Sequence, residues 1–118
     1  MDCHCTWGEF DTAVLRLAGL VRTADIPFKY IYGIPRGGLV LAVALSHRLA
    51  IPLTLNYDKH MSYEVLVVDD ISDSGKTLSA LNPILSVTIH IVKDTTFMPT
   101  FHFAEKQKTD WIIYPWER

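Results

Sequence analysis

Two neighbouring acids and a short polar loop form the most chemically suggestive stretch of this 118-residue chain. Asp69 and Asp70 follow the apolar, mostly β-branched run at 65–68, which we expect to be a strand buried on both faces. A loop with one glycine comes next, at 73–77, and it leads into a helical pattern. Ligands bind at the carboxyl ends of strands in open α/β sheets, so this stretch predicts a ligand site.

The loop has the residues of a phosphate site. A helix N-terminus offers unpaired backbone N–H groups and a partial positive charge, and Gly75 allows close backbone approach. Ser74 and Thr77 add hydroxyl donors. Gly75-Lys76-Thr77 also matches the end of a Walker A motif, but that motif requires a glycine where Asp70 stands. Paired acids beside such a loop instead indicate a sugar phosphate with a divalent cation, because carboxylates hold Mg²⁺ and accept hydrogen bonds from vicinal hydroxyls.

A second glycine loop follows the strand that we expect at 29–33. Arg36 supplies a positive fork suited to phosphate oxygens, and Gly37 and Gly38 free the backbone for a tight turn. The next helix, expected at 39–49, is apolar nearly all round and should be buried. An ordinary βα turn with an exposed arginine is the alternative interpretation.

The remaining patterns fit one modest α/β domain. Thr6 and Glu9 form a capping box that predicts a helix ending near 23–25. Further strands are expected at 51–57, at 87–92 and, as an edge strand, around 100–104. His90 and His102 share no metal-ligand spacing, so we interpret both as structural. Residues 1–5 should form a flexible tail, since Cys3-His4-Cys5 has no second cluster to complete a metal site.

Composition excludes several classes of protein. The 49% content of hydrophobic residues indicates a globular chain, and a net charge of −2 argues against nucleic acid as a partner. The longest apolar run, Leu39 to Leu45, is too short to span a bilayer. The N-terminus lacks the basic start and apolar core of a signal peptide, so we expect a cytoplasmic protein without a membrane partner.

The segment from Val65 to Leu78 resembles the phosphoribosyl pyrophosphate (PRPP) signature of type I phosphoribosyltransferases. That signature is an apolar strand, two acids, two further residues, an aspartate and then Ser/Thr-Gly-x-Thr. The resemblance implies a single domain over residues 1–118 with a mostly parallel sheet, helices on both faces and a reduced hood. It also implies a pentosyltransferase of purine salvage that uses Mg²⁺, moves 5-phosphoribosyl from PRPP to a purine and releases pyrophosphate.

The resemblance assigns roles to the residues of the two loops. Asp69 and Asp70 would hold the ribose hydroxyls and Mg²⁺, partly through water, and Asp73 would be the general base. The 5′-phosphate would lie on Asp73, Ser74, Gly75, Lys76 and Thr77. Pyrophosphate would lie on Pro35, Arg36, Gly37 and Gly38. In the purine enzymes a non-proline cis peptide aims backbone N–H groups at pyrophosphate, and the matching bond here is Pro35–Arg36.

The end of the chain, at 110–117, is similar to the base-recognition segment of bacterial xanthine-guanine phosphoribosyltransferases, in a shortened form. The similarity implies that Trp111 stacks on the purine while the backbone at Ile112 reads its edge. Lys93, at a predicted strand end, matches a lysine that contacts the exocyclic oxygen of a 6-oxopurine. A surface lysine and a terminal strand with core tryptophans are the alternatives.

One departure from the family pattern concerns shielding of the active site. In the family, a long mobile loop usually closes over the site, whereas only a handful of residues connect the strands here, at 56–63. This keeps a second function open, a non-catalytic PRPP- or nucleotide-binding regulator on the same fold. The resemblance further implies a homodimer or homotetramer.

Overall fold

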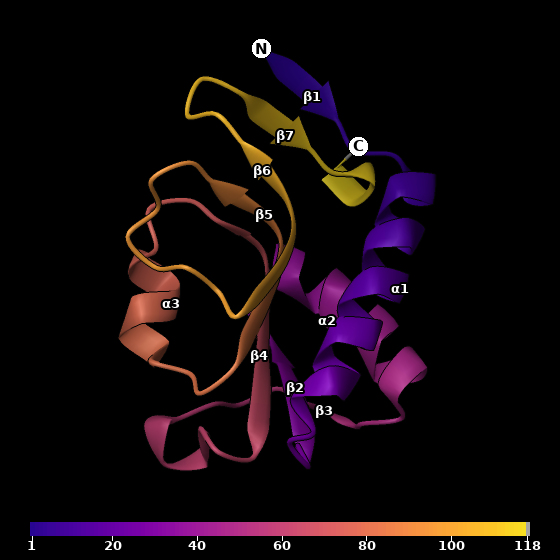
Figure 1. Cartoon of the computed structure of the whole chain (residues 1–118), viewed down its shortest axis with the longest axis vertical. Helices are drawn as coiled ribbons and strands as arrows, with labels where there is room; N and C mark the ends of the chain where they lie inside the picture. Colours follow the sequence, from indigo (N-terminus) through magenta and orange to yellow (C-terminus); the bar gives the residue numbers. More distant parts are fainter. Residues whose placement is uncertain (118) are drawn as a thin grey trace.

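Five parallel strands form the central sheet in the computed structural model, which describes residues 1–117. The strands are β2 (Tyr30–Gly33), β3 (Leu53–Thr54), β4 (Val65–Ser72), β5 (Ser86–Val92) and β6 (Phe101–Lys106). Their order across the sheet is β3-β2-β4-β5-β6, with every pair parallel, so β4 lies in the middle (Figure 1). The first four residues of β4 are fully buried, as the continuous apolar run predicted.

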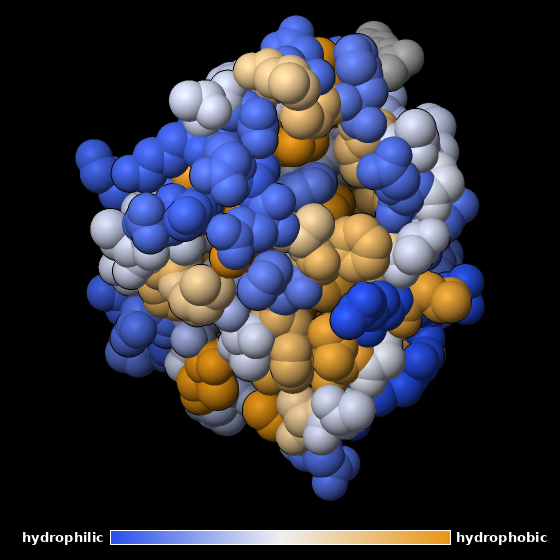
Figure 2. All heavy atoms as spheres, turned by 45° about the horizontal axis from the view of Figure 1, so that its top comes forward, coloured by the Kyte–Doolittle hydropathy of each residue, from blue (hydrophilic) through white to orange (hydrophobic). Residues whose placement is uncertain are grey.

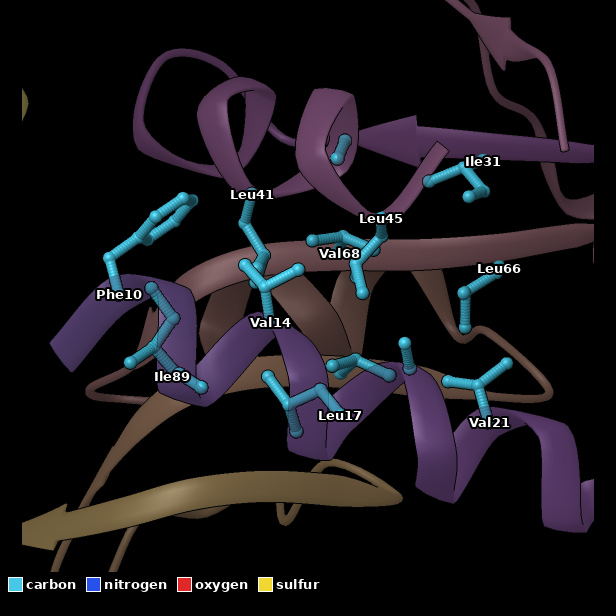
Figure 3. Close-up of a cluster of buried hydrophobic side chains, with 14 of the residues drawn as sticks. Phe10, Val14, Leu17, Val21, Ile31, Leu41, Leu45, Leu66, Val68 and Ile89 are labelled. Atoms are coloured by element: carbon cyan, nitrogen blue, oxygen red, sulfur yellow. The ribbon is translucent and has the colours of Figure 1, made fainter. Parts of the chain in front are cut away.

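Helices cover both faces of this sheet. The longer helices α1 (Trp7–Ala24) and α2 (Gly37–Leu49) share one face, and the short α3 (Lys76–Leu81) lies on the other (Figure 1). Figure 3 shows the larger core, in which side chains of α1 point towards those of α2 and of the sheet. Its labelled residues are Phe10, Val14, Leu17, Val21, Ile31, Leu41, Leu45, Leu66, Val68 and Ile89. The predicted fold class, a single α/β domain with a mostly parallel sheet, is confirmed.

The two long helices differ in how well the sequence predicted them. The Thr6 hydroxyl accepts a hydrogen bond from the Glu9 N–H at 3.0 Å, and α1 ends before Asp25, both as predicted. The prediction for α2 was wrong in two respects. The helix begins two residues earlier than expected, at Gly37, and Val43 is 43% exposed. An apolar composition does not force burial on all sides, because only one face of this helix has a sheet to pack against.

The connection from β3 to β4 packs on the α3 face of the sheet, at the end opposite β1 and β7 (Figure 1). β3 is shorter than the strand predicted at 51–57, and a 3₁₀ turn at Lys59–Met61 follows it. Tyr57 stacks on Tyr32 with ring centroids 5.6 Å apart, and its hydroxyl donates to the Leu81 carbonyl at 3.1 Å. This connection lies away from the N- and C-terminal strands (Figure 1), so it does not cover the carboxyl ends of the sheet.

The first residues of the chain form a strand rather than the flexible tail that we predicted. β1 (Asp2–His4) pairs in parallel with β7 (Trp111–Ile113), and the Cys5 N–H donates to the Ile113 carbonyl at 2.9 Å. Cys5 is buried, and burial raises the pKa of its thiol. A three-residue strand has too short a pattern to detect, and its partner lies more than a hundred positions away. The two strands and the 3₁₀ turn Pro115–Glu117 make a small hood.

The hood lies above the carboxyl ends of the sheet strands in Figure 1. Figure 2 turns this end of the molecule towards the reader and shows hydrophilic and hydrophobic residues side by side, with hydrophobic ones gathered near the centre. Over residues 1–117, no helix combines the length and the hydropathy that crossing a bilayer would require. The carboxyl edge of the sheet and the hood together frame the candidate site.

Candidate active site

The two acids of the signature belong to β4 itself. The strand continues to Ser72, so Asp69 and Asp70 are its fifth and sixth residues rather than the start of a loop. Alternation along the strand sends them to opposite faces, Asp69 to the α3 side and Asp70 to the α2 side. The Asp70 N–H donates to Asp69 Oδ1 at 2.8 Å, which fixes one carboxylate against the backbone of the other.

Both carboxylates are half-buried, and their environment opposes ionisation. Burial raises the pKa of Asp69, and the neighbouring Asp70 raises it further. Burial also raises the pKa of Asp70. Within residues 1–117, no lysine or arginine forms an ion pair with either acid. Two adjacent carboxylates without a basic partner favour a cation, and a bound cation would reverse the cost of ionising them.

The glycine loop packs directly against these acids. A Cβ placed on Gly37 would lie 1.9 Å from Asp70 Oδ2, and one on Gly38 would lie 2.6 Å from the Val68 carbonyl oxygen. Only glycine therefore lets the start of α2 approach β4 this closely. The Pro35–Arg36 peptide bond is cis, as the resemblance predicted. Arg36, Gly37 and Asp70 line a cavity of about 680 Å³ together with residues of the hood.

The loop after β4 encloses a smaller cavity of about 90 Å³ at the start of α3. Its lining includes Asp69, Asp73, Ser74, Gly75, Lys76 and Thr77, so the structure brings together all five predicted loop residues and one acid. Gly75 has φ +82°, a left-handed conformation that favours glycine. The Thr96 hydroxyl donates to the Ser74 carbonyl and holds the loop from outside.

A third cavity, of about 160 Å³, lies between β4 and the hood. Its lining includes Trp111 and Ile112, the two residues predicted to meet a base, and also Asp70 and Asp73. Trp111 is 64% exposed, so it is not the core tryptophan of the alternative interpretation. An exposed indole on a cavity wall can stack on a flat ligand.

Tyr114 ties the hood to the acidic strand. Its buried hydroxyl donates to the Asp70 carbonyl at 3.2 Å and shares a 2.9 Å hydrogen bond with His90 Nδ1. Burial raises the pKa of Tyr114 and lowers the pKa of His90 to about 4, so both side chains are neutral near pH 7. The structural role that we predicted for His90 agrees with these contacts.

Lys93 directly follows the last residue of β5, at the strand end where the sequence placed it. Lys93 is exposed, and it does not line the cavity beside Trp111. Lys106, the last residue of β6, is buried in the wall of that cavity. The Lys93 N–H donates to the Lys106 carbonyl at 2.9 Å, so the two residues are neighbours on adjacent strands. The strand-end argument applied to Lys93 could equally have been applied to Lys106, but β6 gave too weak a pattern to fix its end.

Two aspartates, Asp70 and Asp73, each line two of the three cavities. Asp70 lines both the cavity beside Arg36 and the cavity beside Trp111, and Asp73 lines the latter and the loop cavity. Sequence reasoning also missed Glu117, which lines two of the cavities and accepts a hydrogen bond from the Tyr114 N–H at 3.0 Å. The site thus brings two glycine-containing loops, an acidic centre and an aromatic wall together around three cavities that share lining residues.

Comparison with known proteins places this arrangement in a class. No protein-family model matches the chain. Among solved structures it is similar to a purine phosphoribosyltransferase from Pyrococcus horikoshii, with 27% identity and a TM-score of 0.84 over 99% of this chain and 95% of that one. A Helicobacter pylori xanthine-guanine-hypoxanthine phosphoribosyltransferase gives 20% identity and a TM-score of 0.80, over 99% and 94%. A hypothetical protein from Neisseria gonorrhoeae with bound ppGpp gives 20% and 0.74, over 100% and 90%.

The chain therefore has the type I phosphoribosyltransferase fold, and its resemblance to purine phosphoribosyltransferases is confirmed. Because it spans 95% of the Pyrococcus horikoshii chain, the shortened form is shared with a protein described as a purine phosphoribosyltransferase.

Proposed function

We propose that this protein transfers the 5-phosphoribosyl group of PRPP to an oxopurine base, of the guanine, xanthine and hypoxanthine class, and releases pyrophosphate. The observation that carries the proposal is the meeting of three cavities at Asp70 and Asp73. PRPP has two anionic ends on one ribose, and the acceptor base is flat and neutral. The two glycine loops and the aromatic wall match these three parts.

The anionic ends of PRPP would lie on the two loops. The 5′-phosphate would lie in the cavity at 73–77, whose lining includes the hydroxyl-bearing Ser74 and Thr77 at the start of α3. Pyrophosphate fits the larger cavity beside Arg36, with Gly37 and Gly38 leaving room for close backbone approach. The ribose between them would lie over Asp69 and Asp70, whose oxygens accept hydrogen bonds from its hydroxyls.

The two acids also fit Mg²⁺. They are half-buried, they have raised pKa values and they lack a basic partner over residues 1–117, so a cation would compensate their charge. The described chain holds no cluster of three metal-ligating side chains, so water and PRPP oxygens would complete the shell. Bound Mg²⁺ would neutralise charge on the departing pyrophosphate.

Asp73 is the residue that we assign to proton transfer. In the reaction the bond from ribose C1 to pyrophosphate breaks, a bond from C1 to a purine nitrogen forms, and that nitrogen loses its proton. Asp73 is exposed and lines both the loop cavity and the cavity beside Trp111, so its carboxylate can reach a base nitrogen near C1. A positioned general base typically contributes 10²–10⁴-fold.

The first prediction follows from this role. Asp73→Ala should reduce kcat by about 10²–10⁴-fold while leaving the Kd of Mg·PRPP within about threefold of the wild-type value. Steady-state pyrophosphate release gives kcat, and calorimetric titration gives Kd. Asp58→Ala, in the connection on the α3 face, is the matched control. Loss of PRPP binding without a separate defect in kcat would contradict the assignment.

The function itself is tested by mixing the protein with PRPP, Mg²⁺ and guanine, xanthine or hypoxanthine in turn. Pyrophosphate release with formation of the matching nucleotide is the expected result, and orotate serves as the control acceptor. No release with any purine would overturn the proposal.

Light scattering of the same sample tests the further expectation of a homodimer or homotetramer.

A second candidate function is a nucleotide-binding regulator. Two observations favour it: the connection at 56–63 packs away from the site, and a structural neighbour carries bound ppGpp. Such a ligand combines a guanine base with two diphosphate ends, so it could occupy the same cavities without reaction. Tight ppGpp binding by a protein that releases no pyrophosphate would establish the regulator. Turnover of a purine would exclude it as the sole function.

A further inference from the structure

The connection from β5 to β6 packs against the loop at 73–77. The Thr96 hydroxyl donates to the Ser74 carbonyl. A Cβ on Gly75 would lie 2.5 Å from the Phe97 nitrogen and 2.7 Å from Thr96 Oγ1, so the two segments approach as closely as glycine allows. Neither Thr96 nor Phe97 lines the cavity that this loop encloses. The connection therefore holds the loop from outside the cavity.

A buried hydroxyl anchors this connection to the central strand. Ser72, the last residue of β4, is 2% exposed, and its Oγ donates to the Phe97 carbonyl at 2.8 Å. The same oxygen shares a 3.2 Å hydrogen bond with Thr95 Oγ1. The Phe97 side chain packs against the smaller core, which contains Leu78 of α3. Thr96 thus lies between two residues that are themselves fixed to the body of the fold.

The hydrogen bond from Thr96 fixes the orientation of the peptide between Ser74 and Gly75. Gly75 has φ +82° and ψ −2°, values typical of the third residue of a type II turn. Because glycine adopts positive and negative φ about equally well, the loop alone does not exclude a type I turn, in which this peptide is turned over. The peptide is trans, so its C=O and N–H point in opposite directions. With the Ser74 carbonyl held on Thr96, the Gly75 N–H lies on the cavity side of the loop.

This orientation decides what the loop presents to an anion. A backbone N–H on the cavity side donates to a phosphate oxygen, and hydrogen bonds to charged groups are the stronger ones. The turned-over peptide would present a carbonyl oxygen to the same phosphate. Asp69 and Asp73 line this cavity and repel an anion, so phosphate binding there depends on donors such as the Gly75 N–H.

We propose that Thr96 is a positioning residue for the 5′-phosphate end of PRPP, and that it acts through the peptide between Ser74 and Gly75. This inference rests on the PRPP site of the proposed function and deepens it by separating the two anionic ends of the substrate. Thr96 itself does not contact PRPP. No residue of the connection from β5 to β6 lines the cavity beside Arg36, so the pyrophosphate end is independent of Thr96.

The test compares ligands that carry one anionic end or both. Ribose 5-phosphate has only the 5′-phosphate, Mg·pyrophosphate lacks it, and Mg·PRPP has both ends. Thr96→Val removes the hydroxyl from an exposed side chain and keeps its shape, and Thr96→Ala removes it without a branched side chain. Thr96→Ser keeps the hydroxyl. Thr100→Val is the matched control, because the Thr100 hydroxyl accepts a hydrogen bond from the Ser86 N–H at 3.1 Å in the same connection.

Calorimetric titration gives Kd for Mg·PRPP and Mg·pyrophosphate, and competition against PRPP gives Kd for ribose 5-phosphate. We expect Thr96→Val and Thr96→Ala to raise Kd for PRPP and for ribose 5-phosphate by about tenfold or more, since a donor to a charged group is lost. Kd for Mg·pyrophosphate should stay within about threefold of the wild-type value. Thr96→Ser and Thr100→Val should retain all three values within about threefold.

A residue that only stabilises the fold would weaken both ends alike, so an equal rise in Kd for ribose 5-phosphate and pyrophosphate would overturn the inference. An unchanged Kd for ribose 5-phosphate in Thr96→Val and Thr96→Ala, or the same rise in Thr100→Val, would also overturn it. In each case pyrophosphate release by the wild type would leave the proposed function intact. PRPP binding that depends on Thr96 in a protein without turnover would overturn the transferase and support this inference. No PRPP binding by the folded wild type would overturn both.

Discussion

The carboxyl edge of the sheet and the hood differ in how they are built and in the roles that we propose for them. The acids and glycines at the carboxyl edge of the sheet lie on β4 and on the loops that follow β2 and β4, and the fully buried first half of β4 supports them. The hood is a two-stranded sheet made from the two ends of the chain, and Tyr114 links it to β4. Under the proposed function, anion binding would therefore rest on the buried sheet, whereas base selection would depend on a small appended layer.

This difference predicts that substitutions at the sheet edge affect every substrate, whereas substitutions in the hood change the base and spare PRPP. The largest effect should come from Gly38→Ala. The added Cβ would lie 2.6 Å from the Val68 carbonyl oxygen and 3.0 Å from Asp69 Cα, and both are backbone atoms of the central strand. We expect a loss of about 3 kcal/mol or more in the free energy of unfolding, measured by urea denaturation.

Two other glycines give the matched comparison. Gly37→Ala meets the end of the Asp70 side chain instead of backbone, so the carboxylate can move aside. We expect this variant to fold but to bind Mg·PRPP about 10²-fold more weakly. Gly19→Ala meets nothing within 4 Å inside α1 and should stabilise the chain by about 0.5–1 kcal/mol. Equal stability of the Gly38 and Gly19 variants would contradict the packing argument.

Asp69→Asn tests whether the charge of this carboxylate lowers the stability of the folded protein. Because the folded state raises the pKa of Asp69, folding disfavours the ionised form. The resulting loss in the free energy of unfolding is absent below the pKa of about 4 that Asp69 has in the unfolded chain. It grows as the pH rises from there towards the higher pKa of the folded state. The amide keeps an acceptor for the Asp70 N–H, so the variant should melt higher than wild type at pH 8 and equally at pH 4. A lower melting temperature at pH 8 would show that the ionised Asp69 carboxylate does not lower the stability of the fold. In calorimetric titrations, the same variant should bind Mg·PRPP more weakly than the wild type.

Tyr114→Phe addresses the link between the two regions. Removing the hydroxyl takes a donor from the partly buried Asp70 carbonyl and a partner from His90 Nδ1. We expect a loss of about 1–3 kcal/mol in unfolding free energy and a higher KM for the base, with Kd for PRPP nearly unchanged. Tyr63→Phe is the control, because Tyr63 is 62% exposed. A parallel loss of PRPP affinity would show that the hood and the sheet edge are not separable.

The smallest predicted effect is a pH dependence that comes from His90. Burial lowers its pKa to about 4, so between about pH 6.5 and pH 4 the unfolded chain takes up a proton that the folded chain excludes. Stability should therefore fall by about 1–2 kcal/mol as the pH drops through this window, since the ring is only partly buried. His90→Gln should reduce this slope in urea titrations. An unchanged slope would assign the acid sensitivity to other groups.

The same contrast explains what the sequence could and could not predict. β4 and its loop form a long continuous pattern, so the acids and the residues at 73–77 were found together, and the structure lines one cavity with them. The glycine loop was found for the same reason. The boundaries of β3 and α2 were not, because burial depends on neighbours that local composition does not specify.

The hood could be predicted only in part. Trp111 and Ile112 were found through resemblance, but the pairing of Asp2 with Trp111 joins residues too far apart in sequence for any local pattern. The same lack of a local signal hid Lys106, whose burial depends on how β6 meets the turn at 107–110. Long-range contacts between short strands are where pattern-based reasoning fails in this chain.

The central claim is that the acidic strand end and the two glycine loops bind PRPP. Calorimetric titration of the wild type and of the Asp69→Asn/Asp70→Asn variant with PRPP and Mg²⁺ tests it most directly. We predict one PRPP per chain for the wild type and an affinity at least about 10²-fold lower for the variant. Equal affinity in the two proteins, or no PRPP binding by the folded wild type, would contradict the account.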